Sequence, residues 1–380
     1  MTLSPLTLLT LLACSDPLPR GVLLVTVDTW RADHLAEAVA PNAWAIASDA
    51  ARYTDAWSPI GLTTPAHASM LTGLRPPDHG LRGNNHHGYS LDERFTTAAE
   101  VFAGAGWDTA AFVSAWPAGP EGGLAQGFDT FDGPDAGERD TAEAVEKALA
   151  WLDAREGPWF LWVHAYDPHG PYVPAQEDLD ALGGGRDDAT RYSAEVRASD
   201  RALAPLYKRA LKGGAHLVLT ADHGEVHSEE SCGWQHERSS SEAALRVPLV
   251  VAGPGIEAAE RDERVMLMDV FPTLLKLGGL ADPGGHDGRA LPRPGRVVAI
   301  VESGMCDSNC SPGCKPYGFE GKDRMVYSKK GPTWRERPGT QPVGDPTLKP
   351  FLSDWPPGAP PPAEASEEDI EKGKALGYTQ

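Results

Sequence analysis

Two adjacent threonines, Thr63 and Thr64, precede a proline in the stretch Gly61–Gly73, GLTTPAHASMLTG. Pro65 suits the first turn of a helix, where a missing N–H is harmless. Thr63 is therefore predicted to lie just before a helix N-terminus, where free N–H groups and the helix dipole favour an anion. A hydroxyl in that place is either an ordinary N-cap or a nucleophile for an anionic ester.

Carboxylates and imidazoles follow three apolar runs that are typical of strands buried in a parallel sheet, namely Gly21–Val27, Trp159–Val163 and His216–Thr220. The side chains are Asp28, His164, Asp167, His169, Asp222 and His223. Ligand sites of α/β sheets lie at the carboxyl ends of strands, and these residue types bind Zn²⁺ or Mn²⁺. The alternative is that Asp28 caps a helix and the others belong to ordinary turns and loops.

The composition sets bounds on the fold and on the partners. With 380 residues and 41% hydrophobic residues, the chain is long enough for one large α/β domain and a small appendage. Its formal charge of −20 argues against nucleic-acid binding through a broad basic face. A small anionic ester held by metal ions remains compatible with that charge.

Residues 1–13 are mostly apolar and end in Leu-Leu-Ala before Cys14. This is typical of an export signal with a lipoprotein cleavage site, in which Cys14 is lipidated. The alternative is a plain signal peptide or a short N-terminal helix. The run is too short to span a bilayer permanently. We therefore predict an exported protein that is either periplasmic or held at a bacterial membrane by the lipid alone.

Four cysteines remain, Cys232, Cys306, Cys310 and Cys314. An even number in an exported protein favours disulfides, with three possible pairings. A metal site built from the C-x3-C-x3-C spacing is the alternative, although this spacing is loose for zinc.

The stretch around Thr63 resembles the signature of sulfatases and of the wider alkaline phosphatase superfamily, in which the nucleophile is followed by x-P-x-R and then by T-G. Thr63 falls on the nucleophile, His67 on the arginine and Thr72-Gly73 on the closing pair. Sulfatases convert Cys or Ser at this position to formylglycine, which Thr63 cannot become. Threonine is the nucleophile of nucleotide pyrophosphatase/phosphodiesterase-like members. The resemblance implies a three-layer α/β/α sandwich with a large, mostly parallel central sheet.

The resemblance also implies roles for other residues. Asp222-His223-Gly224-Glu225 matches the family's D-H-G-E, and His79–Asn84 is similar to an H-G-x-x-x-N segment whose Asn binds a phosphate oxygen. The implied first-metal ligands are Asp28, Thr63, Asp222 and His223. The implied ligands of a second metal or of substrate are Asp167, His169 and His236, the last preferred to His227 for its distance from the strand RVPLVV. Substrate contacts are implied for Asn84, His67 and His164.

These observations predict an exported hydrolase that uses one or two divalent ions (Zn²⁺, Mn²⁺ or Ca²⁺). Its substrates would be phosphate or phosphonate mono- or diesters, or sulfate esters, attacked by a metal-bound Thr63 alkoxide. The rivals are a sulfuric ester hydrolase that works without formylglycine and a binding lipoprotein that kept the fold but lost turnover. The predicted domains are an export segment (1–19), a catalytic domain (20–283) and a C-terminal subdomain (284–380) with the cysteines and a terminal helix. Residues 331–362 are predicted to lack regular structure because they are rich in proline.

Overall fold

The computed structural model describes residues 21–227, 236, 239–293, 295–296, 298–302, 324–328, 334–336, 343–352 and 366–375. The predicted export segment and the cysteines Cys14, Cys232, Cys306, Cys310 and Cys314 lie outside these residues. Lipidation and disulfide pairing therefore stay predictions. Within the part of the chain that is described, no helix has the length and apolar character needed to cross a bilayer.

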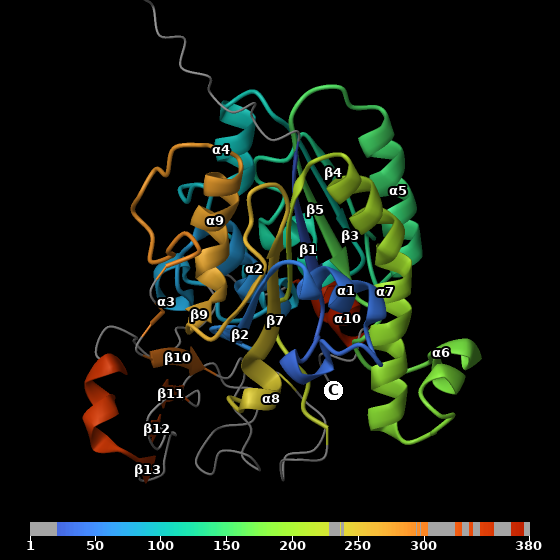
Figure 1. Ribbon diagram of the computed structural model, residues 1–380. Coiled ribbons are helices and arrows are strands. Elements are labelled where there is room, and N and C mark those ends of the chain that lie inside the picture. The colour runs from blue at the N-terminus through green and yellow to red at the C-terminus, as the bar shows by residue number, and fades with distance from the viewer. Residues whose placement is uncertain are drawn as a thin grey trace, which may run out of the picture.

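A nine-stranded mixed sheet forms the centre of the molecule (Figure 1). Its order is β4-β3-β5-β1-β6-β7-β2-β8, with β9 also paired to β2. The strands are β1 (Gly21–Val27), β2 (Ala51–Trp57), β3 (Asp108–Val113), β4 (Thr130–Asp132), β5 (Trp159–Ala165), β6 (His216–Ala221), β7 (Arg246–Ala252), β8 (Ala259–Arg261) and β9 (Val265–Met266). Neighbouring strands run parallel, except that β7 is antiparallel to both β6 and β2.

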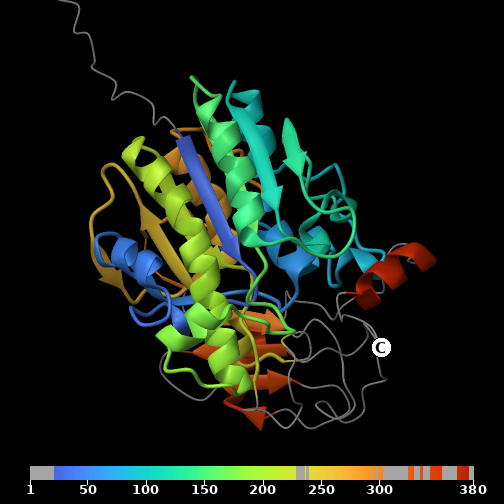
Figure 2. The ribbon, with the colours of Figure 1, turned by 90° about the vertical axis from the view of Figure 1, so that its right-hand side faces the viewer.

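Helices cover both faces of this sheet, as Figures 1 and 2 show. One layer contains α5 (Thr141–Asp153) and α7 (Asp188–Lys212), with α1 (Pro41–Ser48) and α6 (Gln176–Ala181) packed on α7. The other contains α2 (Thr63–Thr72), α4 (Ala98–Gly104) and α9 (Val270–Leu277), which contact one another. Two shorter helices are α3 (Pro76–His79) and α8 (Glu242–Leu245). The predicted three-layer α/β/α sandwich with a mostly parallel sheet is confirmed.

The central strands form where the apolar runs predicted them. Every residue of β1, β5 and β6 is buried, as expected for strands covered on both faces. Val27, the last residue of β1, lies opposite Ala165 of β5 and Ala221 of β6. The residues that follow these three strands therefore emerge together at one edge of the sheet.

A second, four-stranded antiparallel sheet follows in the chain. It is built from β10 (Val298–Glu302), β11 (Arg324–Ser328), β12 (Trp334–Glu336) and β13 (Val343–Gly344). The prediction that residues 331–362 lack regular structure is wrong, because β12, β13 and the 3-10 helix η6 (Pro346–Leu352) lie there. Strands of two or three residues carry too little periodicity to be recognised in a sequence. The terminal helix α10 (Glu367–Ala375) packs near the 3-10 helix η2 (Asn85–His87).

The two sheets share a hydrophobic core. Trp57 of β2 and Met266 of β9 are buried in one cluster with Val301 of β10 and Val326 of β11. Glu302 forms a parallel bridge with Ile60, and its N–H donates to the Pro59 carbonyl over 2.9 Å. The C-terminal sheet is thus joined to the segment that leads into Thr63.

Candidate active site

The carboxyl ends of β1 and β6 bring three candidate groups together. Asp28 follows β1, Asp222 and His223 follow β6, and all three are buried. His223 Nε2 lies 3.4 Å from Asp222 Oδ2 and 3.8 Å from Asp28 Oδ1. One ligand-type atom from each side chain lies within 4.8 Å of the other two. This spacing allows the three side chains to hold one ion between them.

The chemistry of this cluster fits a divalent cation. Among the described residues, Asp28 Oδ1, Asp222 Oδ2 and His223 Nε2 are buried and have no hydrogen-bond partner. Two carboxylates buried side by side are costly unless a positive charge offsets them. Burial lowers the pKa of His223, but the carboxylates of Asp222 and Asp28 outweigh burial and raise it. Carboxylate and imidazole are ligands that Zn²⁺ and Mn²⁺ accept.

The backbone beside Asp28 has an unusual conformation. Thr29 has a φ of 55°, which is rare for a β-branched residue. Its N–H donates to Asp222 Oδ1 over 3.3 Å, and its carbonyl accepts from Tyr192 OH over 2.7 Å. Strained backbone persists only where surrounding contacts hold it, and it clusters at functional sites. These two contacts hold the end of β1 against Asp222.

Thr63 is the first residue of α2, so the prediction that it lies just before the helix is wrong by one position. Leu62 is the N-cap and Pro65 is the third helical residue, which is tolerated because the first four N–H groups of a helix have no intrahelical acceptor. The buried Thr63 hydroxyl lies with Oγ1 3.4 Å from Asp28 Oδ2. The predicted nucleophile is therefore at the edge of the cluster.

Asn84 lies at the same helix N-terminus. Its Oδ1 accepts from the Thr64 N–H over 2.9 Å. Its Nδ2 is buried and donates to none of the described residues. The Thr64 hydroxyl is already engaged, because it donates to the Pro117 carbonyl over 2.7 Å. Asn84 thus offers a buried N–H donor close to Thr63.

His67 has a framework role in this structure. Its Nδ1 lies 2.8 Å from the Thr63 carbonyl and its Nε2 lies 2.9 Å from Thr26 Oγ1. Burial lowers the pKa of His67 to about 3, so the ring is neutral at pH 7. Since a carbonyl only accepts, Nδ1 donates to Thr63 and Nε2 accepts from the Thr26 hydroxyl. The predicted substrate contact therefore competes with two contacts that fix the start of α2.

His164, the sixth residue of β5, remains available to a ligand. Its Nε2 lies 3.5 Å from Asp28 Oδ2, and neither ring nitrogen has a hydrogen-bond partner among the described residues. Burial lowers the pKa of His164 to about 4, against the opposing pull of Asp222. The ring is thus neutral at pH 7. One atom each of His164, His67 and Asp222 also lie within 4.8 Å of one another.

A second group of imidazoles lies beside the cluster. The His236 ring stacks on His223 with centroids 4.4 Å apart, and His169 meets His236 edge-on at 5.1 Å. His236 Nδ1 lies 3.2 Å from Glu225 Oε1, while His236 Nε2 has no partner among the described residues. Tyr166 OH lies 2.9 Å from His169 Nδ1. The structure thus brings both predicted histidines to the site.

The Asp167 carboxylate contacts α5 and α7 instead of the other predicted ligands. It accepts from the Thr141 N–H over 3.1 Å and from the Ser199 hydroxyl over 3.2 Å. It therefore caps the N-terminus of α5 and ties that helix to α7. The structure does not bring Asp167 together with the other predicted ligands, because the turn after β5 directs this side chain towards the helix layer.

Sequence reasoning gave no role to Glu225. The side chain is buried, and it accepts from Tyr172 OH over 3.2 Å as well as from His236. Burial raises the pKa of Glu225, but His236 and the neighbouring imidazoles lower it further, to about 2. The carboxylate therefore stays ionised and orients His236. Its place in the D-H-G-E segment was the signal that could have identified it.

Gly224 of that segment is required by packing. A Cβ at this position would lie 2.0 Å from the Ala243 carbonyl oxygen, and the Gly224 N–H donates to the Ala244 carbonyl over 2.6 Å. Any larger residue would push the His223 and Glu225 backbone away from α8.

The fold and the site together define an α/β sandwich with a hydroxyl beside a buried carboxylate–imidazole cluster at the carboxyl edge of its sheet. The family model described as Sulfatase matches residues 20–280. The chain belongs to the sulfatase family, within the alkaline phosphatase superfamily. Enzymes of this superfamily use divalent metal ions.

Individual relatives are distant. An ulvan-active sulfatase from Formosa agariphila is 24% identical over 351 residues, covering 74% of this chain and 68% of that protein. The phosphonate monoester hydrolase of Silicibacter pomeroyi has a similar structure, with a TM-score of 0.69 and 19% identity over 88% of this chain and 93% of its own. That of Agrobacterium radiobacter gives 0.67 and 19%, with coverage of 95% and 94%. At this identity, the structural likeness establishes the fold alone.

Proposed function

We propose that this protein hydrolyses phosphate or phosphonate esters, as mono- or diesters, or sulfate esters, with Thr63 as the nucleophile. The observation that carries the proposal is the position of Thr63 Oγ1, 3.4 Å from Asp28 Oδ2, at a cluster whose buried Asp28 Oδ1, Asp222 Oδ2 and His223 Nε2 have no hydrogen-bond partner in the described part of the chain. The names of the relatives, a sulfatase and two phosphonate monoester hydrolases, support an anionic ester as the substrate.

Asp28, Asp222 and His223, together with the Thr63 hydroxyl, would hold a divalent cation. When bound, such an ion lowers the pKa of a coordinated hydroxyl and offsets negative charge on ester oxygens. His169 and His236 are candidate ligands of a second ion or of substrate. Asp167 is left out of this set because both its oxygens serve α5 and α7.

The reaction would proceed in two displacements. Thr63 Oγ1 forms a bond to phosphorus or sulfur while the bond to the leaving oxygen breaks and the alcohol departs. Water then cleaves the threonyl ester and restores the hydroxyl. Asn84 Nδ2 and the positive end of the α2 dipole would stabilise the oxygens of the transferred group as their charge develops. The His67 contact to the Thr63 carbonyl holds the nucleophile in position beside Asp28.

A sulfate ester is the second candidate substrate. The family match and the sulfatase from Formosa agariphila favour it. The threonine argues against the usual sulfatase mechanism, because formylglycine cannot be made from it. A sulfatase of this kind would use the threonine hydroxyl itself.

Metal content and hydrolysis should be measured on the same preparations of wild type, Thr63→Ala and Asp222→Ala. The substrates are p-nitrophenyl sulfate and phosphate, a phosphodiester and a phosphonate monoester, each with Zn²⁺, Mn²⁺, Mg²⁺ and Ca²⁺. Thr63→Ala is expected to retain metal but to lose at least about a thousandfold in kcat, since the nucleophile is gone. Asp222→Ala is expected to lose metal and activity together.

Full activity in Thr63→Ala would overturn the nucleophile assignment. Turnover of the sulfate ester alone, with Ca²⁺, would establish the second candidate instead. A wild-type protein that binds no metal and turns over none of the esters would point to a binding protein with this fold.

A further inference from the structure

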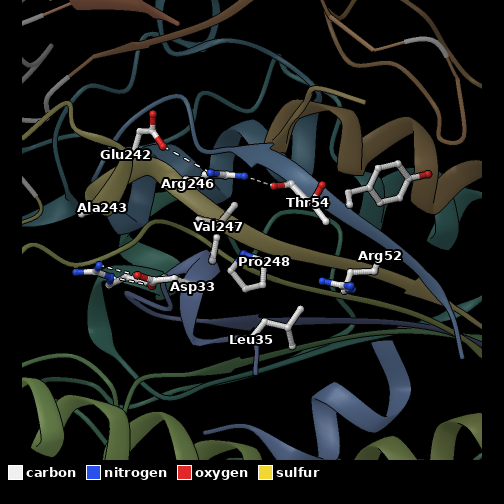
Figure 3. A pocket seen from close by; sticks show the side chains of 12 residues that line it. Asp33, Leu35, Arg52, Thr54, Glu242, Ala243, Arg246, Val247 and Pro248 are labelled. Carbon is white, nitrogen blue, oxygen red and sulfur yellow. Dashed lines mark hydrogen bonds and ion pairs between the residues drawn. The ribbon is translucent and has the colours of Figure 1, made fainter. Parts of the chain in front are cut away.

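A pocket of about 380 Å³ is lined by none of the candidate catalytic residues. It opens between the 3-10 helix η1 (Ala32–His34), β2, β7 and α8 (Figure 3). Three arginines line it, Arg31, Arg52 and Arg246, together with the acidic residues Asp33 and Glu242. In a chain with a formal charge of −20, this cavity brings three guanidinium groups together, each beside a carboxylate of Asp33, Glu260 or Glu242.

Each guanidinium also contacts a group other than a carboxylate. Arg246 Nη2 donates to the Thr54 carbonyl over 2.6 Å, a contact drawn in Figure 3. Arg31 Nη1 donates to the Glu225 carbonyl over 3.3 Å. The Arg52 guanidinium lies over the Trp44 ring, 4.9 Å from its centroid. Such preorganised groups lose little conformational entropy when an anion binds.

The carboxylates that now face these arginines are the more exposed partners. Side-chain exposure is 13% for Arg31 against 59% for Asp33, 24% for Arg52 against 64% for Glu260, and 39% for Arg246 against 60% for Glu242. Exposed ion pairs of this kind contribute about 0 to 1 kcal/mol. An incoming anion can therefore replace Glu260 and Glu242 at small cost, whereas Asp33 is bonded to Arg31 through both of its oxygens.

Apolar residues also line the pocket, and they suit the carbon skeleton of a ligand that carries charged groups. Leu35, Tyr53, Val247 and Pro248 contribute to this lining. Figure 3 shows Leu35 and Pro248 between Asp33 on one side and Arg52 on the other. The volume falls in the range of small-ligand sites. We propose that this pocket binds a sugar that carries two phosphate or sulfate groups, with Arg52 and Arg246 as its main anion contacts.

The test is calorimetric binding of fructose 1,6-bisphosphate and fructose 6-phosphate to full-length Thr63→Ala protein, which prevents turnover. The bisphosphate is expected to bind at least about tenfold more tightly than the monophosphate, because it engages a second guanidinium. Adding Arg52→Gln and Arg246→Gln should abolish this difference. Adding Arg94→Gln, at an exposed arginine outside the pocket, should leave it unchanged.

A preference for the bisphosphate that survives Arg52→Gln with Arg246→Gln would overturn the proposal. If the double Gln variant does not fold, Arg52→Lys with Arg246→Lys is used instead, because it keeps the charges but removes the planar guanidinium groups. At least a threefold loss of the preference for the bisphosphate, about 0.7 kcal/mol, is then expected. In the presence of an intact Thr63, the Gln variants are expected to hydrolyse a small aryl ester within about twofold of wild type. Failure of this proposal is therefore distinguishable from failure of the proposed activity.

Discussion

At the scale of single residues, Glu225 is a carboxylate that orients one of the histidines of the site. Its carboxylate accepts from His236 Nδ1, while His236 Nε2 has no hydrogen-bond partner among the described residues. A histidine ligand whose other nitrogen donates to a carboxylate has a fixed tautomer and orientation. The pKa of Glu225, held at about 2 mainly by His236 against the effect of burial, keeps this acceptor charged.

Glu225→Gln tests that role. The amide keeps an acceptor oxygen but not the charge, so a loss of about 10- to 100-fold in kcat or in metal affinity is expected. Steady-state kinetics at several metal concentrations separates the two effects. Tyr172→Phe is the control, because it removes one contact to the carboxylate over 3.2 Å and leaves its charge. Wild-type kinetics and metal binding in Glu225→Gln would show that His236 needs no such support.

The identities of the cluster residues were predictable, but their directions were not. Asp28 and Asp222 follow strands so apolar that their position at the carboxyl edge of the sheet could be inferred. Asp167 follows a similar strand, yet its carboxylate turns to the Thr141 N–H and the Ser199 hydroxyl. That direction depends on where α5 and α7 pack, which the local sequence does not record.

At the scale of secondary-structure elements, β10 supports the segments that carry Thr63 and Asn84. Arg82, two residues before Asn84, places Nη1 3.1 Å from Glu302 Oε2, and both side chains are buried. Glu302 also bridges to Ile60, three residues before Thr63. A single residue of the C-terminal sheet thus contacts both active-site segments.

Glu302→Leu is expected to destabilise the fold and to lower kcat together. Removing one partner of a buried ion pair costs about 3 to 5 kcal/mol, whereas replacing both partners by apolar residues costs much less. The double variant Glu302→Leu with Arg82→Met should therefore recover stability in urea unfolding while kcat stays low, because Asn84 has lost its anchor. Equal stability of the single and double variants would contradict this account.

Elements of different lengths differed in how well they could be predicted. The seven-residue run GVLLVTV of β1 is buried throughout and was recognisable from its apolar residues alone. The strand β12 has three residues and pairs with both β11 and β13. A strand this short depends on its neighbours in the sheet, and the sequence around it shows chiefly its prolines.

At the scale of the whole molecule, this acidic chain also has acidic residues in its interior. Glu195 of α7 is buried and accepts from the Val173 N–H over 2.7 Å. Burial raises the pKa of Glu195 from 4.5 to about 7, and nearby Asp167, Asp178 and Glu138 add to the rise. The folded state thus favours the protonated form. That contribution to stability is complete below about pH 4.5 and is lost as the pH rises through about 7.

Glu195→Gln removes this titration and keeps an oxygen for the Val173 N–H. The variant is expected to unfold at a higher temperature than wild type at about pH 8, and the difference should shrink towards about pH 5. Thermal unfolding across this range measures it. Glu156→Gln, at an exposed glutamate, should show no such trend. A stability difference that does not change with pH would contradict the assignment to Glu195.

The core shared by the two sheets bears on how such proteins diversify. Trp57 and Met266 belong to the part of the chain that the family model recognises, but they are buried against Val301 and Val326, which lie beyond residue 280. A substitution on either side changes the packing of the other. The C-terminal sheet therefore cannot be exchanged between relatives as an independent module. Substitutions in its packed residues must therefore be compatible with the catalytic domain, so the two parts of the chain must evolve as one unit.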